Sequence, residues 1–128
     1  MRALLDTHAL LWWLSADPAL SPRASRLISN TANTIVVSAA SAWEIATKVR
    51  NGKLNSAVAL AENFEMFLER EGFEQLSVSV EHGIRAGQLP GEHRDPFDRM
   101  LIAQAQAENM PLVSNEAIFG QYGIRRIW

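Results

Sequence analysis

Short apolar runs and longer amphipathic segments alternate along this chain. Apolar runs bounded by polar turns predict strands at residues 2–5, 34–37, 76–80, 110–113 and 124–128. Apolar residues that recur every three or four positions predict helices at residues 9–14, 21–28, 38–50, 58–71, 81–89 and 96–105. Because strands that alternate with helices form βαβ units, we expect an α/β fold with three layers, α/β/α, around a central parallel sheet of four to five strands.

The composition narrows the classes of function. The 128 residues are 48% hydrophobic and 20% charged, so we expect a single globular domain over residues 1–128. The lack of cysteine excludes a disulfide framework and a thiolate metal site. We find no apolar window as long as a membrane span and no signal peptide, so we expect a cytoplasmic protein without a membrane partner. With a net charge of −2, binding of nucleic acid would need a local basic patch or a metal ion.

The segment 93–105 opens a helix with two acids at its start. Asp95 before Pro96 suits an N-cap, and Asp98 then falls in the first turn, where the helix dipole favours a negative charge. The spacing of three residues also puts both carboxylates on one face, while apolar residues from Phe97 onward dock the helix on a core. Taken alone, the pair is explained by capping, and a function requires that other acids converge on it.

Three further acids lie where strands end or helices begin. Asp6 follows the first strand, where open α/β sheets place ligands, and it also suits a helix N-cap. Glu44 completes a capping box if its helix starts at Ser41, whereas a start at Ser38 puts it in the second turn, where capping does not explain it. Glu116 follows the fourth strand, and taken alone it is a loop acid that caps the next turn.

We expect these acids to converge, because the strands of a parallel sheet end at one shared edge. Carboxylates this close repel one another unless a cation lies between them. Oxygen ligands without cysteine or a histidine cluster favour Mg²⁺ or Mn²⁺, and such a site supports attack of water on a phosphodiester. Lys48, Arg50 and Lys53 lie just beyond Glu44 and are either a solvated face or contacts for phosphate.

Four segments carry motifs that can be compared with those of known families. They are LLDTHALLWW (residues 4–13), SAASAWEI (38–45), RDPFDRMLIAQA (94–105) and LVSNE (112–116). In this order and over the whole chain they resemble PIN-domain ribonucleases, and within that group the VapC toxins of type II toxin–antitoxin pairs. The resemblance implies a PIN-like fold and an endoribonuclease that leaves a 3′-hydroxyl and a 5′-phosphate on RNA. It also implies a homodimer and a cognate VapB-like antitoxin, whose C-terminal segment occupies the groove beside the acids.

The resemblance also implies roles for individual residues. Asp6, Glu44 and Asp98 would carry one or two Mg²⁺ or Mn²⁺ ions, with Asp6 and Asp98 as the main direct ligands. Asp95 belongs to the motif as a ligand, as an acid behind the ligands or only as a cap. Glu116 stands where the family usually has aspartate, and its longer side chain would reach a metal ion through water. Ser114 would hold a carboxylate or a water molecule through its hydroxyl. Lys48, Arg50 and Arg99 would contact phosphate. Trp12 and Trp13 would either line the groove for the partner or belong to the core.

Two other classes of function stay open at the level of sequence. In the first, the acids serve only as caps, and the chain is a PIN-like binding module that acts through a protein or RNA partner. In the second, Asp6 is the covalent nucleophile of a phosphotransferase similar to the haloacid-dehalogenase-like enzymes. Those enzymes carry a second acid two residues after the nucleophile, where this chain has His8, which counts against that class.

Overall fold

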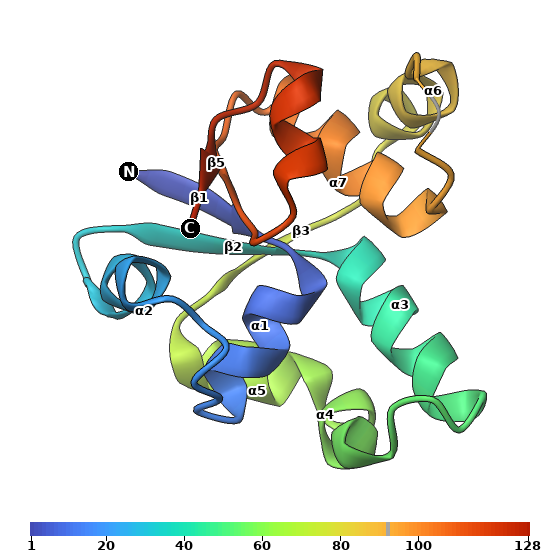
Figure 1. Cartoon of the computed structure of the whole chain (residues 1–128). Helices are drawn as coiled ribbons and strands as arrows, with labels where there is room; N and C mark the ends of the chain where they lie inside the picture. Colours follow the sequence, from blue (N-terminus) through green and yellow to red (C-terminus); the bar gives the residue numbers. More distant parts are fainter. Residues whose placement is uncertain (92) are drawn as a thin grey trace.

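A parallel sheet forms the centre of the computed structural model, which describes residues 1–91 and 93–128. Over these residues five strands lie side by side in the order β3-β2-β1-β4-β5, and every pair is parallel, as the predicted fold class requires (Figure 1). The strands are β1 (Arg2–Leu5), β2 (Thr34–Ser38), β3 (Glu74–Leu76), β4 (Leu112–Val113) and β5 (Arg126–Ile127). The helices are α1 (Thr7–Leu14), α2 (Pro22–Ser29), α3 (Ala39–Arg50), η1 (Asn55–Ala57), α4 (Val58–Glu62), α5 (Phe64–Glu71), α6 (Val80–Gln88), α7 (Pro96–Ala107) and η2 (Ala117–Tyr122).

Both faces of the sheet are buried, because successive side chains of a strand point to opposite sides. Leu4, Val36 and Leu112 belong to one core, which is covered by α7 and η2, and α6 packs against α7 (Figure 1). Leu5 and Val37 belong to the other, which is covered by α1, α2, α4 and α5, with α3 continuing from the end of β2 (Figure 1). Burial on both faces explains why the central strands β1, β2 and β4 are largely apolar runs in the sequence, whereas the edge strand β3 is mostly exposed. Within the described residues, no helix has the length and apolar character needed to cross a membrane.

The carboxyl edge of the sheet collects the starts of several helices. Helices α1 and α3 begin directly after β1 and β2, so their first turns lie at this edge. Helix α7 precedes β4 and runs back towards the start of that strand, so its own first turn lies at the same edge. The segment that follows β4 begins there as well. The fold therefore places four separate segments around one region, which is where parallel α/β sheets bind ligands.

Strands β4 and β5 are shorter than expected, and two other predicted elements differ more in extent. The helix expected over residues 58–71 is divided into α4 and α5, because Asn63 leaves the helical conformation and its side-chain amide donates to the carbonyl of Ala59. The strand expected over residues 76–80 is observed earlier, as β3 at Glu74–Leu76, and shares only Leu76 with the prediction. Ser79 instead caps α6 in a capping box with His82, and this local pairing outweighs the alternation of apolar residues and serines.

Candidate functional site

Asp6 lies between β1 and α1, with only 3% of its surface exposed. Its Oδ1 accepts a hydrogen bond from the backbone N–H of Ala9 at 2.7 Å, so it caps α1. The hydroxyl of Ser114, just after β4, hydrogen-bonds to the same carboxylate and acts to lower its pKa. Burial raises the pKa of Asp6, and the negative charge of Glu116 raises it further. The end of β1 and the end of β4 therefore bring two acids and a serine together.

The two acids at the start of α7 have different surroundings. Oδ1 of Asp95 accepts from the backbone N–H groups of Phe97 and Asp98, at 2.9 and 3.2 Å, so Asp95 is the helix cap. The carboxylate of Asp98 has another partner, since its Oδ2 lies 2.9 Å from Nε2 of His93. Burial raises the pKa of Asp98 to about 6, and the charges of Asp95 and Glu116 act in the same direction. Capping therefore accounts for Asp95 but not for Asp98.

Glu44 lies in the second turn of α3, because Ser38 is the N-cap and accepts the N–H of Ala40. Of the two helix starts that the sequence left open, the one at Ser38 is therefore the one observed, and Glu44 does not form a capping box with Ser41. The Glu44 side chain is buried, and its Oε2 accepts a hydrogen bond from Nζ of Lys48 at 2.6 Å. Its Oε1 is buried and has no hydrogen-bond partner in the described part of the chain. A buried oxygen in this state is unfavourable unless a cation or water completes its environment.

Lys48 connects Glu44 to the acids of α7. The hydrogen bond to Glu44 raises the pKa of Lys48, and the negative charges of the two α7 acids raise it further. Helices α3 and α7 also meet through aromatic side chains, because the ring of Trp43 lies edge-on to that of Phe97 with 4.7 Å between centroids. Glu44 and the start of α7 therefore lie in one neighbourhood, where the positive charge of Lys48 interacts with the acids of both helices.

Glu116 is not a capping residue, contrary to the simplest interpretation of its place in the sequence. It precedes η2, but its side chain makes no capping hydrogen bond among the residues described. Its carboxylate instead lies beside Asp98 and His93, and one possible ligand atom from each of these three residues lies within 4.8 Å of the others. An acid after β4 and an acid in α7 therefore share one site.

The sequence patterns did not reveal His93 as a site residue, and the predicted ligand set contained only oxygen. His93 is the first residue of the segment 93–105, but a spacing of five residues to Asp98, with a helix start between them, does not show that two side chains meet. The structure fixes the place of His93 from two sides. Its carbonyl accepts a hydrogen bond from Arg99 at 3.0 Å, and its ring lies edge-on to Phe119 with 6.4 Å between centroids.

The three basic side chains expected to hold phosphate are placed differently. The guanidinium of Arg99 donates to the carbonyls of His93 and Leu89, which favours a role in holding the segment before α7 over contact with phosphate. The side chain of Lys48 is 36% exposed although it pairs with Glu44. Arg50 is exposed at the end of α3. The geometry therefore leaves Lys48 and Arg50 as the better-placed candidates.

The donor set at this edge fits a divalent cation. The donors close enough to share one ion are Asp98, Glu116 and the imidazole of His93, while Asp6, on which the charge of Glu116 acts, and the buried, unpartnered oxygen of Glu44 lie outside this group of three. Carboxylic acids whose pKa is raised by burial and by each other become stable as anions when a cation neutralises them. Oxygen ligands suit Mg²⁺ and Mn²⁺, and imidazole is accepted more readily by transition metals such as Mn²⁺. An ion held here could activate water and stabilise negative charge on a phosphate.

The raised pKa of Asp98 predicts how the stability of the metal-free protein depends on pH. The folded state holds this proton more tightly than the unfolded chain, whose ordinary pKa is 3.8, against about 6 in the fold. The free energy of unfolding should therefore fall as the pH rises from about 4 to 6, by at most about 3 kcal/mol for this group. Urea unfolding in EDTA at several pH values measures the fall. Asp98→Asn should reduce it, and an unchanged slope in that variant would contradict the assignment.

A parallel sheet with acids from separate segments at its carboxyl edge defines an α/β protein with a candidate cation site. More particularly, the chain belongs to the PIN domain family, which it matches over residues 3–124. The resemblance to this family inferred from the sequence motifs is confirmed. No curated protein matches the sequence.

Solved structures of toxin–antitoxin complexes share the fold. VapBC2 from Rickettsia felis, bound to a DNA fragment from its promoter, is 22% identical over 99% of this chain and 98% of that chain, with a TM-score of 0.71. FitAcB from Neisseria gonorrhoeae is 18% identical over 98% and 96%, with a TM-score of 0.69. VapBC-1 from nontypeable Haemophilus influenzae is 15% identical over 99% and 97%, with a TM-score of 0.63. At these identities the likeness shows the fold alone.

Proposed function

We propose that this PIN-domain chain is a metal-dependent endoribonuclease and the toxin of a toxin–antitoxin pair. The observation that carries the proposal is the meeting of Asp6, Asp98 and Glu116 at one edge, with a buried Glu44 oxygen that has no partner among the described residues. Caps alone do not account for it, because Asp98, Glu116 and Glu44 are not engaged in capping. A phosphodiesterase that uses Mg²⁺ or Mn²⁺ needs this kind of carboxylate cluster.

In the proposed mechanism Asp6, Glu44, Asp98 and Glu116 hold one or two ions. When bound, Mg²⁺ or Mn²⁺ would lower the pKa of the attacking water and stabilise charge on the phosphate. The hydroxyl of Ser114 and the N–H of Ala9 fix the carboxylate of Asp6. The reaction breaks the bond from phosphorus to the 3′-oxygen and forms one from phosphorus to water oxygen, which leaves a 3′-hydroxyl and a 5′-phosphate.

We propose unpaired RNA as the substrate. Trp43 is 60% exposed and lies next to Glu44, with its ring braced against Phe97. An exposed ring beside the acids offers a base a surface for stacking, which typically contributes about 1–3 kcal/mol per base in single-strand binding. Lys48 and Arg50 lie one and two turns further along α3, where they could hold phosphates on either side of the cut bond. Action on cellular RNA would place the protein in the cytoplasm.

We propose that the cognate antitoxin binds a groove beside α1. The groove has a volume of about 360 Å³, and its walls include the apolar side chains of Leu11, Trp12, Leu60 and Phe67. Trp12 is partly exposed and stacks on His8, which also lines the groove and lies near Asp6, so an occupant of this groove would lie close to that acid. An apolar segment of the antitoxin that ends in a basic residue would complement both the apolar walls of the groove and the acids beside it, in the manner of a helix in a groove. The likeness to the VapBC2 and FitAcB structures supports such a partner.

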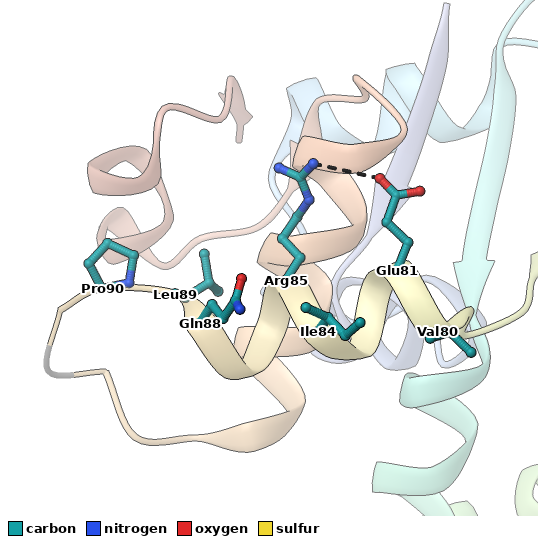
Figure 2. A pocket seen from close by; sticks show the side chains of 7 residues that line it. All are labelled: Val80, Glu81, Ile84, Arg85, Gln88, Leu89 and Pro90. Carbon is teal, nitrogen blue, oxygen red and sulfur yellow. Dashed lines mark ion pairs between the residues drawn. The ribbon is translucent and has the colours of Figure 1, made fainter.

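A second copy of the chain is the partner we propose for α6. Val80 and Ile84 lie on its outer side with 80% and 55% of their surface exposed, over a hollow of about 590 Å³, and the ion pair of Glu81 with Arg85 lies beside them (Figure 2). If two antiparallel α6 helices cross at Ile84, the exposed Val80 of one copy lies near Gln88 of the other, so the apolar face is buried against its own copy.

Replacement of Ile84 by glutamate is expected to convert the proposed dimer to a monomer, because it puts two charges into the apolar centre of the contact. Light scattering coupled to gel filtration measures the change. Met66→Glu is the matched control, since Met66 is 45% exposed on α5, away from this face, and the variant should stay dimeric. A dimer that persists in Ile84→Glu would show that the copies meet elsewhere.

The experiment that tests the proposed function is cleavage of a defined RNA pool by the purified chain. Cleavage is expected with Mn²⁺ or Mg²⁺, and it should be lost in excess EDTA or in Asp6→Asn. Cleavage that continues undiminished in EDTA would remove the mechanism. The absence of cleavage in any metal, together with no gain in thermal stability from Mn²⁺, would favour a PIN-like binding module without a catalytic centre.

A further inference from the structure

We propose that the imidazole of His93 is a direct ligand of the divalent cation, so that the centre binds metal through nitrogen as well as oxygen. The inference rests on the proposed function, because it specifies the cation site of that function. The motifs of the sequence implied carboxylate ligands only. The structure adds a histidine that lies among them.

The spacing of the atoms carries the inference. Nε2 of His93 lies 2.9 Å from Oδ2 of Asp98, and the possible ligand atoms of these two residues and Glu116 all lie within 4.8 Å of one another. Neighbouring ligands of an octahedral ion with bonds of about 2.1 Å lie about 3 Å apart, and opposite ligands about 4.2 Å apart. The three side chains therefore stand close to the spacing that one ion would impose, without a movement of the backbone.

His93 is also held in place by groups outside the acidic cluster. Arg99 binds its carbonyl, and the fully buried ring of Phe119 lies against the edge of its imidazole. Such contacts fix the direction of a metal ligand before the metal arrives. A shared cation also balances both neighbouring carboxylates, Asp98 and Glu116, whereas a hydrogen bond from neutral His93 to Asp98 balances neither charge.

A nitrogen ligand changes which metal the site prefers. Imidazole suits transition metals such as Mn²⁺, whereas Mg²⁺ selects oxygen and retains water. His93→Gln is therefore expected to weaken Mn²⁺ binding by roughly tenfold or more, since even groups behind the ligands contribute about 10–100-fold. Binding of Mg²⁺ should change less. The ratio of the two affinities reports the nitrogen ligand independently of RNA cleavage.

The direct test is pulsed electron paramagnetic resonance on the full chain with Mn²⁺ alone. A nitrogen coupling to Mn²⁺ is expected, and it should change when the histidines carry ¹⁵N. The coupling should vanish in His93→Gln and persist in His8→Gln, the matched control, since His8 also lies near Asp6. Thermal unfolding without metal checks that both variants fold. If His93→Gln does not fold, ¹⁵N-labelled His8→Gln still identifies the ligand, because it retains only His82 and His93. His82 is buried and hydrogen-bonded to Ser79 and Gln104, so a histidine coupling in this variant comes from His93.

The outcomes separate this inference from the proposed function. Bound Mn²⁺ without a histidine coupling, or with a coupling that is lost only in His8→Gln, would overturn the role of His93 and leave a cation site made of carboxylates. If a protonated His93 only forms ion pairs with the acids, Mn²⁺ will bind without a histidine coupling. Failure of the wild-type chain to bind Mn²⁺ at all would overturn both the inference and the metal-dependent mechanism.

Discussion

Asp98→Asn is expected to reduce RNA cleavage by roughly 10²–10³-fold, the scale seen when one group that stabilises developing charge is removed. Asparagine keeps the shape of the side chain, and the cap of α7 belongs to Asp95, so the helix should form normally. The loss would come from the missing negative charge between His93 and Glu116. Initial rates on a defined RNA at saturating Mn²⁺ measure the effect, and circular dichroism checks the fold.

Asp17→Asn is the matched control for this experiment. Asp17 is exposed in the loop after α1, where its carboxylate accepts the N–H of Ala19, a bond that asparagine can also make. Its cleavage rate should equal that of the wild type. Equal rates in Asp98→Asn and Asp17→Asn would remove Asp98 from the catalytic site, while a loss in both would point to a general effect of charge.

Gln104→Ala is expected to lower the free energy of unfolding by about 2–4 kcal/mol, because each buried polar partner left without its bond typically costs about 1–3 kcal/mol. Gln104 is fully buried in α7. Its Oε1 accepts from the hydroxyl of Ser38, which caps α3, and its Nε2 donates to the carbonyl of Ser77 and lies 3.3 Å from Nδ1 of His82. This one amide therefore ties the starts of α3 and α6 to α7. Urea unfolding measures the change.

Gln106→Ala is the control for burial, since Gln106 lies on the same helix but is half-buried and donates to the carbonyl of Tyr122. Its expected cost is about 1 kcal/mol, that of one ordinary hydrogen bond. If the two variants lose the same amount, the buried contacts of Gln104 contribute less than their geometry indicates, and another contact must hold α3 and α7 together.

The fold could be predicted from two patterns in the sequence, the short apolar runs of the strands and the amphipathic segments of the helices that alternate with them. A run such as residues 2–5, which is apolar on both faces of its strand, indicates a strand covered by helices on both sides. Strands of this kind are typical of parallel sheets. The division of α4 from α5 could not be predicted, because Asn63 lies within a continuous amphipathic period and breaks it through a single side-chain bond. The extent of β3 was missed because Ser79 and His82 pair locally, where alternation suggested a longer strand.

The candidate site could be predicted in its place but not in its contacts. The topology of a parallel sheet is enough to bring the ends of β1 and β4 to one edge, and so Asp6 and Glu116 to one region. The capping interpretation of Glu116 failed because a position before a turn does not fix where a side chain points. The bond between His93 and Asp98 and the commitment of Arg99 to two carbonyls depend on the path of the segment before α7, which no local pattern encodes.

Isothermal titration of Mn²⁺ into the wild-type chain, Asp6→Asn and Glu116→Gln tests most directly whether distant acids form one cation site. Residues 6 and 116 are separated by nearly the whole chain, and both variants keep the size of the side chain. If the acids share an ion, each variant should bind Mn²⁺ roughly tenfold or more weakly than the wild type, and the two losses should not be additive. Wild-type affinity in both variants would contradict the shared site.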